Sequence, residues 1–166
     1  MQRIKMIANH GQEKKYYHKV LGCNSRLDSI QAAILNVKLK ELDAYAANRN
    51  KMADVYYQEL TGMDEIRLPK KANNSDHVFH QFTLIIKNGK RDDLKLFLSE
   101  KGIPSMIYYP LPLYKQEAFK KYVDKGFKLP VTEQLCNEVL SLPIHTEMDP
   151  VQMDYICKTI KTFFTK

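Results

Sequence analysis

The segment GCNSRLDSIQAAIL, Gly22–Leu35, joins a glycine, a small polar pair and an arginine directly to an apolar pattern typical of a helix. Ser25 stands three residues before Asp28 in a capping-box pattern, so we expect a helix that begins at Arg26 with Ser25 as its N-cap. The free N–H groups of that first turn, the Asn24 carboxamide and the Arg26 guanidinium could then meet on one anion, a phosphate or a carboxylate. The alternative is a loop that ends at Asn24 and Ser25, with Arg26 in solvent.

The composition fits a globular protein that buries a core, since 44% of the 166 residues are hydrophobic. No apolar run is long enough to span a membrane, and no charged-then-apolar leader follows Met1. We therefore expect a cytoplasmic protein with no membrane partner. Cys23, Cys136 and Cys157 lie far apart and lack the paired spacing of a zinc or redox motif, so neither a disulfide nor a structural metal is expected.

The net charge of +7 raises the question of nucleic-acid binding. The basic residues are spread thinly, the lysine pairs are separated by acidic residues, and the chain has neither a basic run nor an RNA-binding aromatic signature. The sequence favours a solvated basic face, or attraction to anionic small molecules. We expect no nucleic-acid partner.

Apolar residues recur at three- and four-residue steps over the range 27–60. The pattern predicts one long helix, or two helices with a bend near Asp43. A continuous helix of this length would measure about 50 Å at ~1.5 Å per residue, so it must project, bend or bridge two bodies. A shorter helix is expected over residues 1–8, closed at His10 and Gly11, and its missing N-cap suggests that the chain is the C-terminal portion of something longer.

A polar stretch over residues 61–76 contains Gly62, Pro69 and a cluster of Asn, Ser and Asp, which predicts a linker and a domain boundary. Beyond it the pattern predicts a small α+β layer of helices packed on a sheet of a few strands. The expected elements are strands at 77–86, 103–109 and 140–142 and helices at 91–101, 116–122, 132–140 and beyond Asp149, which forms a capping box with Gln152.

Two further groups of residues could carry chemistry. His77 and His80 are three apart, and in a strand they would face opposite sides, so we do not expect them to share a metal. The segment IYYPLPLY, Ile107–Tyr114, combines tyrosines with stiffening prolines, which suits a pocket for a polar ring such as a sugar or a base; a packed connection explains it equally well. His18 could serve as a hydrogen-bonding residue of a site. The sequence contains no Gly-rich phosphate loop, nucleophile elbow or Ser/His/Asp signature.

Four blocks cover nearly the whole chain in order: NHGQEKKYYHKVLGCNSRLDSIQAAIL, HVFHQF, RDDLKLFLSEKGIPSMIYYPLPLYKQEAF and LPVTEQLCNEVLSLPIH. Together they resemble the C-terminal half of the DegT/StrS family of pyridoxal-phosphate-dependent sugar aminotransferases. The most specific part of the resemblance is the run Tyr16-x-His18, Gly22-x-Asn24-Ser25-Arg26-Leu27-Asp28 and Gln31-Ala32-Ala33.

The resemblance implies the fold of a fold-type-I aminotransferase. Residues 1–60 would be a remnant of the large domain together with the long connecting helix, and residues 61–166 would be the C-terminal α+β small domain. Such enzymes are homodimers with active sites at the subunit interface, and their cofactor is pyridoxal 5'-phosphate. They transfer an amino group, usually from glutamate, to a keto group of a nucleotide-linked sugar, in amino-sugar and cell-surface polysaccharide biosynthesis such as that of lipopolysaccharide.

The resemblance also implies roles for single residues. Asn24 would reach across the dimer to the cofactor phosphate, and Arg26 and His18 would contribute to the substrate site. Tyr108 and Tyr109 would line the substrate, in a loop that often reads His-Tyr-Pro in the family. Tyr108 occupies the histidine position of that motif, and this departure leaves the sugar preference open.

The catalytic lysine of the family, which forms a Schiff base with the cofactor, precedes the asparagine in a segment that this chain does not contain. No catalytic residue is therefore assigned in the chain, and we expect the isolated chain not to transaminate. The alternative is a non-catalytic interaction or regulatory module that keeps the dimer surface.

Overall fold

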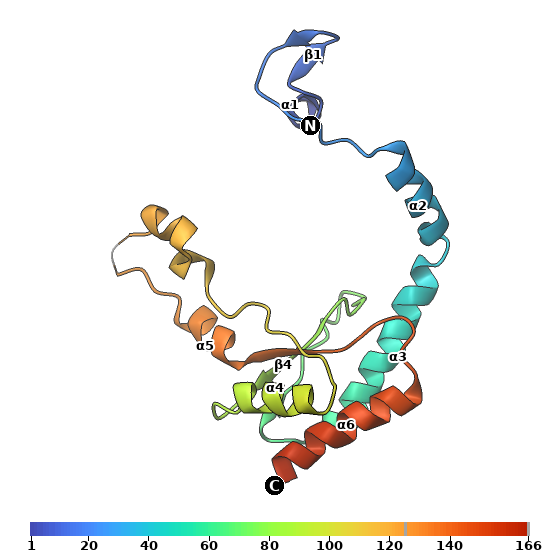
Figure 1. The fold of residues 1–166 in the computed structure, drawn as a ribbon, viewed down its shortest axis with the longest axis vertical. Coiled ribbons are helices and arrows are strands. Elements are labelled where there is room, and N and C mark those ends of the chain that lie inside the picture. The colour runs from blue at the N-terminus through green and yellow to red at the C-terminus, as the bar shows by residue number, and fades with distance from the viewer. Residues whose placement is uncertain (125, 166) are drawn as a thin grey trace. The chain divides into compact units, whose positions relative to one another are not determined.

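The computed structural model describes residues 1–124 and 126–165. The chain divides into two compact units, Met1–Asp43 and Ala44–Lys166, each described here by itself. The first unit contains the helix α1 (Gln2–Ile7), an antiparallel hairpin and the helix α2 (Ser29–Leu39) (Figure 1). The hairpin pairs β1 (Gln12–Lys14) with β2 (Tyr17–His18). The short helix expected at the start of the chain is confirmed.

The start of α2 differs from the prediction. Asp28 is the N-cap: its Oδ1 accepts from the Gln31 N–H at 2.8 Å, and Gln31 Oε1 accepts from the Asp28 N–H at 3.3 Å. The expected helix start at Arg26 with a Ser25 cap is therefore wrong. Two overlapping capping patterns compete here, and the Ser25 N–H instead donates to the Ala8 carbonyl at 2.9 Å, which holds Ser25 in the preceding segment.

The helical pattern of residues 27–60 forms two helices, the second of the two predicted possibilities. The helix α2 ends at Leu39 and α3 (Leu42–Leu60) follows after Lys40 and Glu41. The helix α3 contributes Tyr56 and other buried residues to the core of the second unit. The division into domains 1–60 and 61–166, drawn for a complete enzyme, stays a prediction.

The second unit is built on a three-stranded antiparallel sheet in the order β3-β4-β5. Helices pack against this sheet, and the predicted α+β class is confirmed (Figure 1). Its elements after α3 are β3 (Ile66–Arg67), β4 (Phe82–Ile86), α4 (Arg91–Glu100), the 3-10 helices η1 (Leu113–Lys115) and η2 (Glu117–Tyr122), α5 (Pro130–Glu138), β5 (Val139–Leu142) and α6 (Pro150–Thr165).

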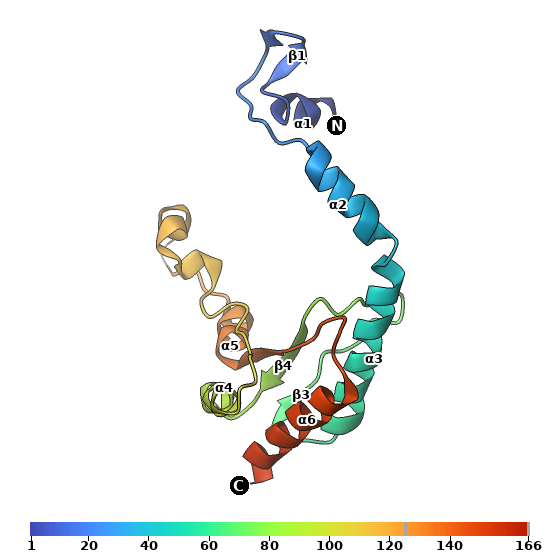
Figure 2. The ribbon, with the colours of Figure 1, turned by 45° about the vertical axis from the view of Figure 1, so that its right-hand side comes forward.

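The core of the second unit lies on one face of the sheet. Alternate β4 residues are buried there, and Tyr56 of α3 places its ring centroid 4.8 Å from that of Phe82 and donates its hydroxyl to the Pro143 carbonyl at 2.7 Å. The helix α6 runs beside α3, where Lys161 Nζ lies 2.6 Å from Glu59 Oε2 (Figure 2). The fully buried side chains include Tyr56, Leu60, Phe79, Phe82, Leu84, Ile86, Leu94, Leu98, Leu140, Met153, Cys157 and Ile160.

Two of the predicted strands are shorter than expected. Only residues 82–86 of the range 77–86 form a strand, because Phe79 and Phe82 are both buried, and residues three apart in a strand would face opposite sides. Phe79 meets the core from a loop with φ +45°. The strand expected at 103–109 is a single bridge between Met106 and Ser141, flanked by prolines that have no N–H to donate.

The remaining helices agree better with their patterns. The helix α4 ends one residue earlier than expected, and the helix expected at 116–122 is the 3-10 helix η2, Glu117–Tyr122. The capping box of α6 is confirmed: Asp149 Oδ1 accepts from the Gln152 N–H at 2.8 Å, and Gln152 Oε1 accepts from the Asp149 N–H at 3.2 Å. Within the described residues, no helix is both long and apolar enough to cross a membrane.

Candidate functional site

Backbone hydrogen bonds fix the segment that carries Asn24. The Cys23 N–H donates to the Ile7 carbonyl at 2.9 Å, and the Cys23 carbonyl accepts from the His10 N–H at 2.9 Å. Asn24 itself forms a single antiparallel bridge with Asn9. The segment is therefore held along the end of α1 and the turn that follows it, although it belongs to no named strand.

Gly22 allows this close approach of two backbones. A Cβ at this position would lie 2.3 Å from Gly11 N and 2.4 Å from the Ile7 oxygen, closer than any carbon can approach. Gly11 has φ +78°, and a Cβ there would lie 1.7 Å from the Val20 oxygen. Both positions therefore require glycine, and the position of Asn24 depends on them.

Arg26 orients the side chain of Asn24. Arg26 Nε donates to Asn24 Oδ1 at 2.9 Å, and because a guanidinium can only donate, this bond places the amide oxygen toward Arg26 and leaves Asn24 Nδ2 free to donate elsewhere. In the part of the chain that the structure describes, Asn24 Nδ2 and the terminal nitrogens of Arg26 have no hydrogen-bond partner, and both residues are exposed. These N–H groups form a donor set suited to an anion.

The helix α2 begins after Asp28 and not at Arg26, and the Asp28 carboxylate accepts one N–H group of its first turn. The expected convergence of the other first-turn N–H groups with Asn24 and Arg26 on one anion stays a prediction. The donor set that the structure describes consists of the Asn24 and Arg26 side chains.

His18 lies at the end of β2 in the same unit. Its Nδ1 is 2.7 Å from the His10 carbonyl oxygen. A carbonyl can only accept, so Nδ1 carries a proton, and in the tautomer with a single ring proton Nε2 would be an acceptor. Among the described residues, no hydrogen bond joins His18 to Asn24 or to Arg26.

The predicted substrate tyrosines lie in the second unit, after the bridge at Met106. The ring centroids of Tyr108 and Tyr109 are 5.8 Å apart at an interplanar angle of 68°, and the peptide bond between them is cis. Tyr109 is 72% exposed and Tyr108 is 37% exposed. In the described residues neither hydroxyl has a hydrogen-bond partner, so both remain available to a ligand.

Glu133 of α5 anchors the end of the tyrosine-proline segment. Tyr114 donates its hydroxyl to the Glu133 carboxylate, Lys115 Nζ lies 2.5 Å from Glu133 Oε2, and the Tyr114 ring packs edge-on against Phe127 at 5.3 Å. The hydrogen bonds from Lys115 and then Tyr114 hold the pKa of Glu133 below its usual range, and the bond to Glu133 raises the pKa of Lys115. No pattern in the sequence pointed to Glu133, because its partners are more than fifteen residues away in the chain.

The predicted site residues fall in two groups. His18, Asn24 and Arg26 belong to the first unit, and Tyr108 and Tyr109 belong to the second. Within the described residues, a hydrogen bond joins Asn24 to Arg26, and the rings of Tyr108 and Tyr109 meet edge-on.

The histidine pair at 77 and 80 lies in the loop before β4. The prediction that a strand would turn the two rings to opposite faces is wrong, because the strand begins only at Phe82. Among the described residues, no group of three or more His, Cys, Asp or Glu side chains is placed to hold a metal ion. All three cysteines are free thiols, with Cys23 exposed and the other two buried.

The chain belongs to the DegT/DnrJ/EryC1/StrS aminotransferase family, whose model matches residues 1–161. The recognition made from the sequence, the C-terminal half of such an aminotransferase, is confirmed.

Known relatives are similar over almost the whole chain. A protein of Geobacillus stearothermophilus named pleiotropic regulatory protein is 43% identical over 98% of this chain and 44% of its own length. The dTDP-3-amino-3,4,6-trideoxy-alpha-D-glucose transaminase of Streptomyces venezuelae is 36% identical over 91% of this chain and 39% of its own length. The crystal structure of S. venezuelae DesV in complex with a ketimine intermediate superposes with a TM-score of 0.91 at 33% identity, covering 99% of this chain and 44% of that one. The chain thus spans less than half the length of the relatives it matches.

Aminotransferases of this family depend on pyridoxal phosphate, and a related structure, ntda of Bacillus subtilis, was solved with bound cofactor PMP (26% identity, TM-score 0.85, 97% of this chain and 38% of that one). The residues present here fit the phosphate end of such a cofactor. Asn24 Nδ2 is turned outward as a donor by the bond from Arg26, and donors of this kind are what a phosphate oxygen requires.

Proposed function

We propose that the chain is part of an aminotransferase that moves an amino group from glutamate to a keto group of a nucleotide-linked sugar, in amino-sugar biosynthesis. The family membership and the names of the relatives, which include dTDP-sugar and UDP-sugar aminotransferases, support this proposal. The observation that carries it is the Asn24–Arg26 donor pair on a segment held backbone to backbone. Pyridoxal 5'-phosphate, when bound, would supply the electron sink for the reaction.

The residues of this chain would bind and orient. Asn24 would donate from Nδ2 to the cofactor phosphate in the partner subunit of a homodimer, and Arg26 would donate from its terminal nitrogens to an anionic group of the substrate. His18 would accept a hydrogen bond at Nε2 from the substrate. Tyr108 and Tyr109 would cover the sugar ring with flat apolar surface and offer it their hydroxyls.

The isolated chain would not transaminate, because the lysine that forms the Schiff base in the family has no counterpart in it. The complete enzyme would be cytoplasmic and would serve the synthesis of amino sugars for cell-surface polysaccharides such as lipopolysaccharide. The sugar preference stays open, since Tyr108 occupies a position that is often histidine in the family.

The second candidate is a non-catalytic interaction or regulatory module. Two observations favour it. The helix α2 buries none of its residues in this chain and exposes Ile30 (75%) and Val37 (70%), which leaves an apolar face for another protein surface. The relative from Geobacillus stearothermophilus is also named as a regulatory protein.

The test is a chimera in which residues 1–161 replace the matching segment of the Streptomyces venezuelae transaminase. Glutamate-dependent amination of that enzyme's keto sugar would be followed by mass spectrometry of the nucleotide sugar and by release of 2-oxoglutarate. We expect amination above that of a chimera whose host lysine is replaced by alanine. A chimera that folds, dimerises and binds the cofactor but aminates nothing would contradict the proposal and favour the regulatory module.

Asn24 and Arg26 provide the matched variants within this chimera. Asn24→Ala should weaken cofactor retention by roughly 1–3 kcal/mol, the range for a hydrogen bond to a charged group. Arg26→Ala should leave the cofactor bound and mainly raise the KM for the anionic substrate. Equal loss of cofactor from both variants would mean that the roles assigned to them are wrong.

A further inference from the structure

The tyrosine-proline segment, Ile107–Tyr114, is attached at both ends to one continuous stretch of chain. At its start, the Met106 N–H donates to the Ser141 carbonyl at 3.1 Å, and the Ser141 N–H donates to the Met106 carbonyl at 2.7 Å. At its end, the Tyr114 hydroxyl donates to the Glu133 carboxylate. Glu133 lies on α5 and Ser141 lies on β5, which follows α5 directly. The segment therefore bridges α5 and β5.

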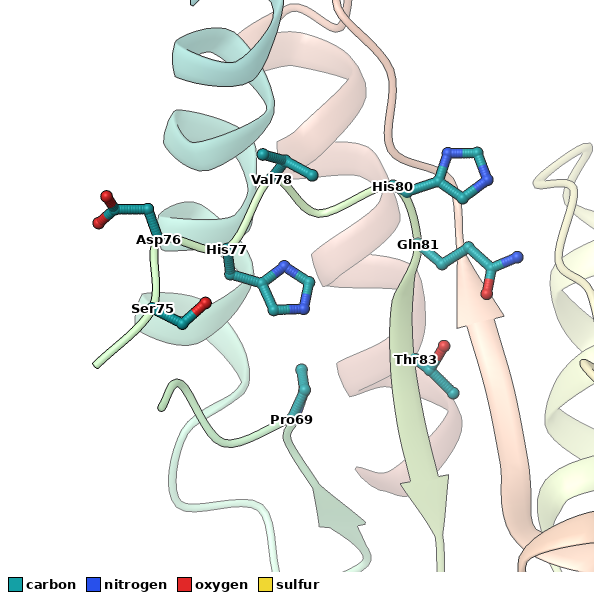
Figure 3. Close-up of a pocket in the computed structure, with 8 residues that line it drawn as sticks. All are labelled: Pro69, Ser75, Asp76, His77, Val78, His80, Gln81 and Thr83. Atoms are coloured by element: carbon teal, nitrogen blue, oxygen red, sulfur yellow. The ribbon is translucent and has the colours of Figure 1, made fainter. Parts of the chain in front are cut away.

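The strand β5, which carries the first attachment, is fixed in the sheet. It pairs with β4 over Val139–Leu142, and Ser141 Oγ lies 2.8 Å from Thr83 Oγ1. Figure 3 shows Thr83 on β4, where it lines a hollow of about 490 Å³ together with His77. Main-chain and side-chain hydrogen bonds thus both hold the strand to which Met106 is bound.

The joint between α5 and β5 is fixed by Arg91 of α4. Its guanidinium is buried and donates from Nη1 to the Cys136 carbonyl at 3.0 Å and to the Val139 carbonyl at 3.3 Å. Cys136 belongs to α5 and Val139 to β5, so one charged group binds both sides of the joint. Because the joint is held in this way, the two attachments of the segment keep a fixed separation.

Glu133 provides the polar part of the second attachment. Its carboxylate accepts from the Tyr114 hydroxyl, and Lys115 Nζ lies 2.5 Å from its Oε2. The Glu133 side chain is 29% exposed, which limits the competition of water for these bonds. The bonds from Lys115 and then Tyr114 hold the pKa of Glu133 below its usual range, so at neutral pH the carboxylate is charged and accepts both bonds.

Between the two attachments the segment is stiff but makes few bonds to other elements. Pro110 and Pro112 each fix a φ angle, and Pro112 is buried. Among the described residues, no hydrogen bond joins Tyr108, Tyr109 or Leu111 to another element. The positions of the two tyrosine rings therefore depend on the two attachments and on the prolines between them.

We propose that Glu133 is a positioning residue for the keto sugar, because it holds the end of the tyrosine-proline segment and so keeps Tyr108 and Tyr109 over the sugar ring. The inference rests on the proposed function, in which these two tyrosines cover that ring. Glu133 acts through Tyr114 and Lys115 and is assigned no contact with a reacting atom. Its substitution should therefore change the binding of the sugar and leave the reaction with glutamate as it is.

The first experiment measures the order parameters of the Tyr108, Tyr109 and Leu111 amides in the 166-residue chain by nuclear magnetic resonance. They should be about 0.85 in the unsubstituted chain, the value of a rigid backbone, and should fall below about 0.6 in Glu133→Ala. Glu138→Ala is the matched control, because Glu138 lies on the same helix and its carboxylate accepts from a side chain of that helix. This control should leave the three order parameters unchanged.

The second experiment measures both halves of the reaction in the chimera described above. Glu133→Ala should raise the KM for the keto sugar by about tenfold and change kcat by less than about threefold. The release of 2-oxoglutarate from glutamate, in a single turnover without the sugar, should keep its rate, whereas a general loss of structure would slow it. Glu138→Ala should change neither quantity.

Two milder variants grade the effect. Glu133→Gln keeps an acceptor for one of the two donors and should recover part of the KM. Tyr114→Phe removes one bond but keeps the ring that packs against Phe127, so it should raise the KM less than Glu133→Ala does. Tyr114→Phe also carries the test on its own if Glu133→Ala does not fold, and an unchanged KM in it would then contradict the positioning role.

The outcomes separate this inference from the proposed function. Unchanged order parameters in Glu133→Ala, an unchanged KM for the sugar, or a KM effect matched by an equal loss of the reaction with glutamate would each overturn the positioning role. Any of these results in an active chimera would remove the inference alone. An unsubstituted chimera that folds and aminates nothing would contradict the proposed function, and with it the role of Glu133 toward the sugar.

Discussion

Replacing Gly22 with alanine should release the segment that carries Asn24. The added Cβ would lie 2.3 Å from Gly11 N and 2.4 Å from the Ile7 oxygen, and both are backbone atoms that cannot turn aside as a side chain would. The two chain segments must therefore separate by about 1 Å to restore an ordinary contact. Such a separation would break the hydrogen bonds of Cys23 to both neighbours, which are now 2.9 Å long.

The size of the effect follows from the bonds lost. Three backbone hydrogen bonds tie residues 23–25 to residues 7–10, and each contributes about 0.5–1.5 kcal/mol. Their loss amounts to roughly 2–4 kcal/mol of local stability. Hydrogen exchange of the His10, Cys23 and Ser25 amides should then become about 30- to 1,000-fold faster, since about 1.4 kcal/mol corresponds to a factor of ten.

Leu21→Ala is the matched control, because Leu21 is 99% exposed and adjacent to the substituted glycine. It should change the exchange of the same amides by less than about threefold. Unchanged exchange of the His10, Cys23 and Ser25 amides in Gly22→Ala would refute the close packing of the two segments. The placement of Asn24 would then need another explanation.

Three other predictions concern the second unit and the thiols. Arg91→Ala should lower the free energy of unfolding in urea by roughly 2–4 kcal/mol, because the buried guanidinium donates to two carbonyls at the end of α5. Arg91→Lys should recover part of that free energy, and equal stability of all three proteins would contradict the stabilising role of Arg91. Ellman's reagent should modify Cys23 rapidly and Cys157 only after unfolding, since burial raises the pKa of Cys157 to about 12; fast reaction of Cys157 would disprove its burial. The pKa of Glu133, followed through its carboxyl carbon signal, should lie below its usual range because Lys115 and Tyr114 donate to the carboxylate, so its contribution to stability is present at neutral pH and is lost as the pH falls through the lowered pKa. A midpoint unmoved by Lys115→Ala would exclude the ion pair as the cause.

Local patterns predicted two elements of the second unit closely. The capping box at Asp149 formed as expected, where Pro150 at the first helical position favours the same start, and the periodic pattern of α4 placed that helix to within one residue. The start of α2 was wrong because Ser25 and Asp28 both head capping patterns. Tertiary hydrogen bonds of residues 23–25, which no local rule contains, decided between them.

Long-range contacts account for what the sequence could not predict. The run before β4 alternates like a strand, but the burial of Phe79 in the core from a left-handed backbone conformation places its neighbours in a loop. The tie of Tyr114 to Glu133 and the hollow beside His77 each join segments whose pairing depends on the folded sheet. The sequence predicted that Asn24 and Arg26 share an anion site. The hydrogen bond from Arg26 that orients the Asn24 side chain was visible only in the structure.

The central claim is that the Asn24–Arg26 pair serves the active site of the partner subunit, and subunit mixing tests it most directly. One chimera would carry Arg26→Ala, and the other would lack the host's Schiff-base lysine. In a mixed dimer one site would then hold both lesions and the other would hold neither, so amination at substrate concentrations below KM should return to about half of that of the unsubstituted chimera. Two variants that stay inactive after verified subunit exchange would show that Arg26 acts within its own subunit and would contradict the account.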